Sequence, residues 1–264
     1  MKVAIVTIAY DNDLEFLKYN IRSIKKYCHG YTRHCVILDN DQSCDKTKRY
    51  LDGINYPYVV DDLAHEIEHG YIRQQYMKLR CDLHTQDCDY VCHVDSDSIF
   101  TKHNDPTVFF IDNKPVIVIS SYDTLIQNRR EHNDHHSIEN WRNSTSDAVG
   151  FFVDYEFMAQ MPLVYPVKIF KKVRDHLEQY HEKTLYNQLK TINTFSEYNV
   201  IGAYAYKHMH TDFYWVDRFN TENLDQYLYN DFFGHYSSRN VPYQSHRYVD
   251  ISQHDNIISK HFTD

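Results

Sequence analysis

Short apolar runs alternate with amphipathic segments through the first 120 residues of the chain. The runs have the length of strands and are rich in β-branched residues, which is typical of strands buried on both faces of a sheet. They span residues 2–9, 35–38, 58–60, 90–94 and 115–120. Apolar residues recur at helical spacing over residues 14–28 and 70–83. This alternation predicts an α/β fold with a mixed, mostly parallel sheet flanked by helices.

The rest of the chain has a less regular pattern. Residues 128–143 are polar, rich in histidine and long for a connection, which indicates a mobile or functional loop. Further strands are expected at 148–153 and 247–252, and helices at 168–189 and 196–206. We find no internal repeat and no domain boundary, so we expect a single domain.

Aspartate follows the carboxyl end of each predicted strand up to residue 94. Open α/β sheets bind their ligands at that edge, so these acids are candidates for a binding site. The alternative is that aspartate is common after strands because it favours turns and helix caps. Both interpretations stay open for most of these positions.

Composition narrows the classes of protein to consider. The chain is 42% hydrophobic and 25% charged, as globular proteins are. Its net charge is −9 and it has no long run of Lys or Arg, which argues against a nucleic-acid binder. No segment approaches the length of a transmembrane span, and the N-terminal apolar run is too short for a signal peptide. The 6 cysteines form no CxxC pair, which excludes a zinc ribbon or thioredoxin motif. Several of them lie in apolar strand or helix patterns, which favours a reducing compartment, and the lack of an export signal favours the cytoplasm.

One Asp-x-Asp pair differs from the others in its surroundings. The chain has 27 aspartates, so about three such pairs are expected by chance. Four occur: Asp11/Asp13, Asp39/Asp41, Asp87/Asp89 and Asp95/Asp97. Only the last, in DYVCHVDSDSIF, lies between two apolar runs. Two buried carboxylates need a cation or a proton, and a hard divalent metal ion is the natural partner for oxygen ligands.

These segments carry a family resemblance. VAIVTIAYD resembles the first strand of nucleotide-sugar glycosyltransferases of the GT-A type, and VDSDSIF resembles their DXD motif. The small soluble sugar transferases of large DNA viruses and bacteria are the most similar members. The resemblance covers the first 120 residues and, beyond them, only isolated features. It implies a Rossmann-like GT-A domain over residues 1–264, with a nucleotide-binding half (1–120) and an acceptor-binding half (121–264).

The resemblance implies a metal and a donor site. Asp95 and Asp97 would hold Mn²⁺ or Mg²⁺, and the ion would bind the diphosphate of a nucleoside diphosphate sugar, UDP- by default and GDP- possible. A histidine near the C-terminus, His254, would be a further metal ligand, with His235 as its rival. Donor contacts are expected from Thr7, Ala9, Tyr10, Asp39, Arg73, Lys78, Asp95 and Ser96. The alternatives are core packing for Thr7 and Ala9, an aromatic cover for Tyr10, and a solvated helix face for Arg73 and Lys78.

The resemblance also implies a base for a glycan acceptor. In inverting members an acid at the start of a late helix deprotonates the acceptor hydroxyl, and Glu197 occupies such a position. The alternative is a capping box of Thr194 and Glu197, or a cap by Ser196. Asp147 is the second candidate for catalysis or sugar contact. The setting would be the cytoplasm, including that of a virus-infected host cell.

Two other classes stay open. An apolar strand that runs into Asp-x-Asp also occurs in phosphatases of the haloacid dehalogenase type, where the first aspartate is the nucleophile. That family places the motif on an early strand and needs a downstream lysine and an acidic pair. The third class is a non-catalytic sugar-binding module that uses the many tyrosines, of which the chain has 24.

Overall fold

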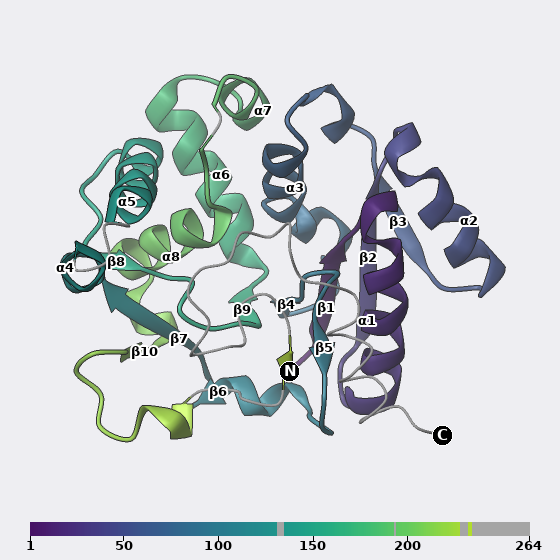
Figure 1. Cartoon of the computed structure of the whole chain (residues 1–264), viewed down its shortest axis with the longest axis horizontal. Helices are drawn as coiled ribbons and strands as arrows, with labels where there is room; N and C mark the ends of the chain where they lie inside the picture. The colour runs from purple at the N-terminus through teal and green to yellow at the C-terminus, as the bar shows by residue number, and fades with distance from the viewer. Residues whose placement is uncertain (131–134, 193, 228–231, 234–264) are drawn as a thin grey trace.

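A five-stranded sheet forms the centre of the computed structural model, which describes residues 1–130, 135–192, 194–227 and 232–233 (Figure 1). Its strand order is β3-β2-β1-β4-β9. The first four strands pair in parallel, and β9 pairs antiparallel with β4. The strands are β1 (Val3–Ile8), β2 (Arg33–Asp39), β3 (Tyr58–Asp61), β4 (Tyr90–His93) and β9 (Leu163–Pro166). The expected α/β class with a mostly parallel sheet flanked by helices is therefore confirmed, and the strand order is compatible with a Rossmann-like fold.

Helices on both faces explain why these strands are continuously apolar. On one face, Val36 and Leu38 pack with Leu17 of α1 (Leu14–Tyr27) and Leu51 of α2 (Asp45–Gly53). On the other face, Ile37 belongs to the larger core, together with residues of α3 (Gly70–Lys78).

The order of strands reverses at the β1–β4 pair. The chain runs from β1 outward to β2 and β3, and then returns to place β4 on the other side of β1. Open α/β sheets form a crevice at such a point, beyond the carboxyl ends of the two strands. In this chain the two loops beside that crevice begin at Ala9 and at Val94.

Most of the remaining elements form a second region, to the left in Figure 1. The helices are α4 (Tyr122–Arg130), α5 (His135–Val149), α6 (Lys168–His181), α7 (Leu185–Leu189) and α8 (Glu197–His208). The other strands are β5 (Ile99–Phe100), which lies beside α1, and β6 (Phe110–Ile111), β7 (Lys114–Ser121), β8 (Tyr155–Glu156), β10 (Tyr214–Asp217) and β11 (Phe232–Phe233). Short 3₁₀ helices span Asp11–Asp13, Gln42–Cys44, Ala64–Glu66, Cys81–His84, Pro106–Phe109, His210–Asp212 and Leu224–Tyr227.

Several predicted elements are wrong in this second region. The expected loop at 128–143 is largely helical, because α4 and α5 each place a few apolar residues, such as Ile126 and Ile138, in the core. The expected strand at 148–153 is not a strand: α5 runs to Val149, and Gly150 follows with φ 74°, the left-handed conformation that ends helices. The expected helix at 168–189 is two helices, separated where Glu182 adopts φ 52°. The expected strand at 247–252 lies outside the described residues.

All six cysteines are free thiols. Within the described ranges, no helix is both long enough and apolar enough to cross a lipid bilayer.

Candidate functional site

The Asp95–Asp97 segment forms a tight turn at the carboxyl end of β4. Val94 continues the sheet by donating its N–H to the Val6 carbonyl at 3.0 Å, and Ser98 N–H then donates to the Asp95 carbonyl at 3.0 Å. Asn20 of α1, which is fully buried, donates its side-chain amide to the Asp95 and Ser98 carbonyls at 3.2 and 2.8 Å. The turn is therefore held from the side of the sheet that α1 covers, and both carboxylates project from a fixed backbone.

Three carboxyl groups influence one another at this edge. Burial and the nearby charges of Asp95 and Asp13 raise the pKa of Asp97 to about 7. Burial and Asp95 also raise the pKa of Asp13, although the Ser96 hydroxyl opposes this shift with a hydrogen bond. Asp13 follows β1, so β1 and β4 bring two of the sequence's Asp-x-Asp pairs to the same crevice. Asp13 is not among the site residues predicted from the sequence, because the sequence alone does not show that β1 and β4 are neighbours.

A buried lysine is the immediate partner of Asp95. Lys78, the last residue of α3, places Nζ 2.8 Å from Asp95 Oδ1 and 2.9 Å from Glu197 Oε1. Its side chain is only 5% exposed, and Nζ also lies 4.5 Å from the centre of the Tyr198 ring. Burial alone would lower the Lys78 pKa, but the Asp95 and Glu197 carboxylates outweigh burial and hold the pKa well above its ordinary value. Lys78 is therefore buried, and the alternative of a solvated helix face is wrong for this residue.

Glu197 is the first residue of α8, and its carboxylate pairs with this lysine. Ser196 caps the helix by accepting the Asn199 N–H at 3.3 Å, so the cap is Ser196 and not Thr194. The Glu197 N–H donates to Gln75 Oε1 of α3 at 3.2 Å, which docks the start of α8 on α3. Glu197 is 1% exposed, and burial raises its pKa while Lys78 lowers it.

Arg73 is also turned inward from α3. It donates to Asp39 Oδ2 at 2.9 Å and to Asp41, and its side chain is 12% exposed. Tyr10 lies near the same groups, and its hydroxyl donates to Met77 Sδ at 3.4 Å. Burial and the Asp39 charge raise the Tyr10 pKa well above its ordinary value.

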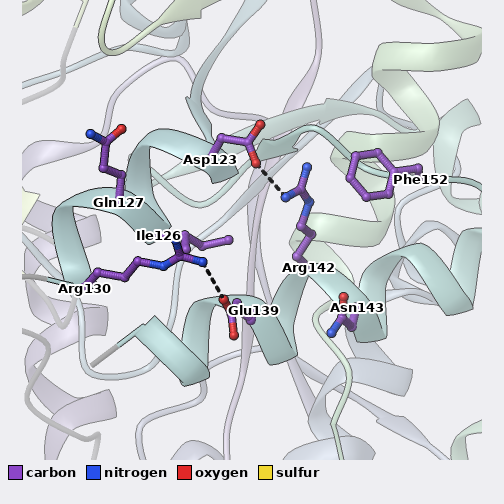
Figure 2. Close-up of a pocket in the computed structure, with 8 residues that line it drawn as sticks. All are labelled: Asp123, Ile126, Gln127, Arg130, Glu139, Arg142, Asn143 and Phe152. Atoms are coloured by element: carbon purple, nitrogen blue, oxygen red, sulfur yellow. Dashed lines mark hydrogen bonds and ion pairs between the residues drawn. The ribbon is translucent and has the colours of Figure 1, made fainter. Parts of the chain in front are cut away.

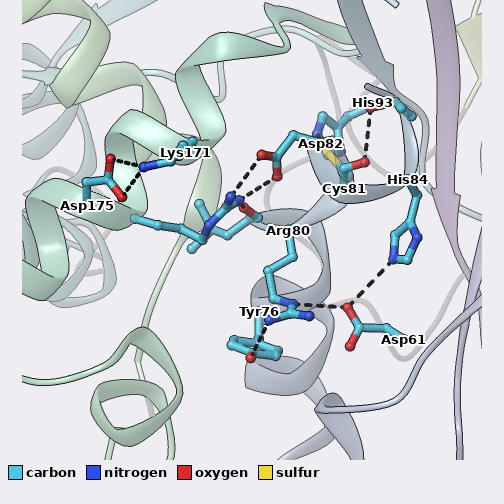
Figure 3. A network of polar contacts seen from close by, with 12 residues as sticks. Asp61, Tyr76, Arg80, Cys81, Asp82, His84, His93, Lys171 and Asp175 are labelled. Carbon is cyan, nitrogen blue, oxygen red and sulfur yellow. Dashed lines mark hydrogen bonds and ion pairs between the residues drawn. The ribbon is translucent and has the colours of Figure 1, made fainter. Parts of the chain in front are cut away.

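A third cation also contacts an aspartate at the end of a strand, and it is not among the residues predicted from the sequence. Arg80, two residues after α3, donates from Nε to Asp61 Oδ2 at 3.1 Å and from Nη1 to the Tyr76 hydroxyl at 3.0 Å (Figure 3). Aspartates at or just after the ends of β2, β3 and β4 therefore each meet a cation from α3 or the turn behind it. The pairs are Asp39–Arg73, Asp61–Arg80 and Asp95–Lys78.

Thr7 and Ala9 are core residues in this structure. Both are fully buried, and Thr7 Oγ1 donates to the Val94 carbonyl at 2.8 Å while sharing a 2.9 Å hydrogen bond with His34 Nε2. Thr7 thus ties the end of β1 to the start of the acidic turn. This placement matches the packing alternative for these two positions.

The other predicted site residues lie apart from the Lys78 cluster or outside the described chain. Asp147 is exposed in the last turn of α5, not in a loop before a strand. Among the described residues, no ion pair joins its carboxylate to the groups around Asp95. His254 and its rival His235 lie outside the described residues.

The Asp95 and Asp97 carboxylates suit a metal ion whose other ligands are waters and substrate oxygens. Within the described part of the chain, no three His, Cys, Asp or Glu side chains are arranged to hold an ion by themselves. Mg²⁺ usually keeps several waters and takes only one or two carboxylates together with substrate phosphates. Asp95 and Asp97 provide two such carboxylates. The negative charges of Asp95 and Asp13 help to raise the Asp97 pKa, and a bound cation would neutralise these charges.

Comparison with family models and curated proteins does not identify the chain. No family model matches the chain, and no curated protein matches its sequence. Function therefore has to follow from the chemistry of the site.

Proposed function

We propose that this chain is a metal-dependent glycosyltransferase that moves a sugar from a nucleoside diphosphate sugar to a glycan acceptor. The observation that carries the proposal is the group of Asp13, Asp95 and Asp97 at the edge where the strand order reverses. Clustered negative charge at a ligand-binding edge fits a ligand that brings a divalent cation. The GT-A type, UDP as the default nucleotide, GDP as its rival and a cytoplasmic setting belong to the same proposal.

The metal site would consist of Asp95 and Asp97 with Mn²⁺ or Mg²⁺. Such an ion offsets the negative charge that develops on a leaving nucleoside diphosphate. Lys78 Nζ lies 2.8 Å from one oxygen of Asp95, which gives the carboxylate a defined direction. Ser96 hydrogen-bonds Asp13 and restrains the third acid of the group.

The donor nucleotide would lie across the ends of β1 and β2. This end of the sheet carries Tyr10, Asp39 and Arg73. The ion pairs of Arg73 with Asp39 and Asp41 form a polar rim there. Thr7 and Ala9 would support the pocket from within the core, because both are fully buried.

Glu197 is the proposed proton acceptor. Its raised pKa suits a general base, since a base works best when its pKa is close to the operating pH. Its burial under Lys78 means that an acceptor hydroxyl reaches it only after a local rearrangement. Asp147, which is exposed on α5, is the second candidate.

An Asp97→Ala variant tests the proposal. Donor hydrolysis would be measured over UDP-, GDP- and dTDP-sugars with Mn²⁺, together with the rise in melting temperature that nucleotide plus Mn²⁺ produces. We expect wild type to respond to one nucleotide class and Asp97→Ala to lose both turnover and the metal-dependent shift. Asp62→Ala is the matched control, because Asp62 is an exposed aspartate just after β3. Full activity in Asp97→Ala, or no response to any nucleotide, would refute the proposal.

The same assays separate the rival functions. A phosphatase of the haloacid dehalogenase type would release phosphate from phosphomonoesters, and it requires a lysine downstream of its nucleophile. The lysine that contacts Asp95 is Lys78, which lies upstream, so the geometry does not favour that mechanism. A sugar-binding module would respond to glycan without nucleotide or metal.

A further inference from the structure

An open hollow of about 610 Å³ lies between α4 and α5, away from the Asp95 turn (Figure 2). Asp123, Gln127 and Arg130 reach it from α4, at spacings that place them on one face of that helix. Glu139, Arg142 and Asn143 reach it from α5, with the same kind of spacing. Two helices thus present polar faces to a shared space.

Phe152 forms one wall of the hollow. It is 65% exposed, and the Arg142 guanidinium lies 4.1 Å from its ring centre. Arg142 is itself fixed, because Nη1 donates to Asp123 at 2.8 Å and Nε donates to the Val153 carbonyl at 3.0 Å. The ring is therefore backed by a fixed cation and offers much of its surface to solvent.

The exposure of Phe152 is not that of an isolated surface side chain. Phe152 also lines a second hollow of about 300 Å³, together with Phe151, Tyr155 and Tyr206. Single exposed apolar residues need no explanation, but an aromatic patch beside a polar hollow is typical of a binding surface. Aromatic rings supply rigid contact area at a small cost in conformational entropy.

The charges in the larger hollow compensate each other. Arg142 pairs with Asp123 at 2.8 Å, and Arg130 lies 3.7 Å from Glu139. Neither an anion nor a cation is therefore favoured. The Gln127 and Asn143 side-chain amides have no hydrogen bond to another described side chain, and each offers donors and an acceptor.

We propose that this hollow binds a neutral saccharide unit, with its apolar ring face stacked on Phe152 and its hydroxyls bonded by Gln127 and Asn143. Hydroxyl groups both donate and accept, which matches the paired charges and the amides, and a pyranose has an apolar face that suits an aromatic ring. The assignment of this unit to a substrate rests on the proposed transferase function. The bound unit then belongs to the glycan acceptor, at a point remote from the sugar that is extended.

Affinity measurements on the full chain test the site. Isothermal titration would use maltohexaose, cellohexaose and mannohexaose as neutral probes and hexagalacturonate as an acidic one. We expect at least one neutral probe to bind, Phe152→Ala and the double variant Gln127→Ala/Asn143→Ala to weaken it at least tenfold, and Phe152→Trp to retain it. Phe219→Ala is the matched control, because Phe219 is also exposed, at 38%, and lines neither hollow.

Three results would overturn the saccharide site: no neutral probe binds, Phe152→Ala binds as wild type does, or the acidic probe binds best. A separate assay of donor hydrolysis distinguishes failure of the saccharide site from failure of the transferase proposal. If Phe152-dependent binding is found in a chain that hydrolyses no sugar nucleotide, the saccharide site stands and the transferase proposal fails. If hydrolysis is found and no saccharide depends on Phe152, only the saccharide site fails.

Discussion

Lys78 Nζ lies 2.8 Å from Asp95 Oδ1, so the negative charge at the end of β4 is balanced from within the chain. The same ammonium lies 2.9 Å from Glu197 Oε1 at the start of α8. One cation therefore compensates two acids that come from different parts of the sequence. Burial and the charges of Asp95 and Asp13 raise the pKa of Asp97 to about 7, although Lys78 acts in the opposite direction.

Replacing Lys78 with methionine should strongly destabilise the protein. Methionine fills similar space but leaves two largely buried carboxylates without their cation, and breaking a buried ion pair in this way costs roughly 3–5 kcal/mol. Urea unfolding would measure the loss. The matched control is Lys171→Met, since Lys171 pairs with Asp175 at 2.6 Å on the surface of α6 and should contribute less than about 1 kcal/mol. Equal effects of the two variants would contradict the compensation described here.

Glu197→Gln should reduce turnover far more than it reduces stability. Glutamine keeps the shape of the side chain but cannot accept a proton, and general-base catalysis contributes typically 10²–10⁴-fold in rate. The rate of sugar transfer would be measured under saturating donor and acceptor, with Asp147→Asn as the comparison. A near-normal kcat in Glu197→Gln, with a large loss in Asp147→Asn, would move the base to α5.

His34 should make the protein less stable as the pH falls below about 6.5. Burial lowers the pKa of folded His34 to about 3, so the unfolded chain takes up the proton first and stability is lost from about pH 6.5 downward. Between pH 7 and pH 5 the loss from this residue is about 2 kcal/mol. Other groups also titrate in this range, so the measurement is the difference in pH slope between wild type and His34→Gln.

The control for this slope is His65→Gln, which changes an exposed histidine. Urea unfolding at several pH values would be compared for the three proteins. His34→Gln also loses the hydrogen bonds that the ring shares with Thr7 and Tyr56, at 2.9 and 2.7 Å, which shifts stability at every pH. An unchanged slope in His34→Gln would show that the histidine is not buried as a neutral ring.

Two glycine-to-alanine changes should have opposite signs. A Cβ on Gly202 of α8 would lie 2.2 Å from Cγ of the buried Phe157 ring, and overpacking of this kind costs typically 1–3 kcal/mol. A Cβ on Gly53, at the end of α2, would meet nothing within 4 Å, so alanine should stabilise by about 0.4–1 kcal/mol. Thermal unfolding would compare the two variants, and stabilisation by Gly202→Ala would show that α8 does not pack on Phe157 as described.

The central sheet could be predicted because its signals are local. Strands such as β1 and β2 are continuous apolar runs, and the spacing of Leu17, Ile21 and Ile24 marks α1. The Asp95–Asp97 pair was also recognisable, since apolar residues flank it on both sides. Each of these features depends on neighbours within a few positions.

The environment of the acids could not be predicted, because it is created by distant segments. The apolar stripe of α3 predicted one buried face, and it left Lys78 either as a donor contact or on a solvated helix face. In the structure α8 packs against α3, so Lys78 is enclosed by Glu197 and Tyr198, more than a hundred residues away. Helix α5 was missed for a related reason: its polar face lines an open hollow, and its few apolar residues give little periodicity.

Strand β9 determines where the chain can be divided. It comes from the second half of the sequence, yet it pairs with β4, the strand that leads to the acidic turn. A fragment ending near residue 120 would leave the N–H and C=O groups of that side of β4 exposed, and an unpaired edge recruits other chains. Recombinant halves should therefore aggregate when made alone and recover solubility only when produced together.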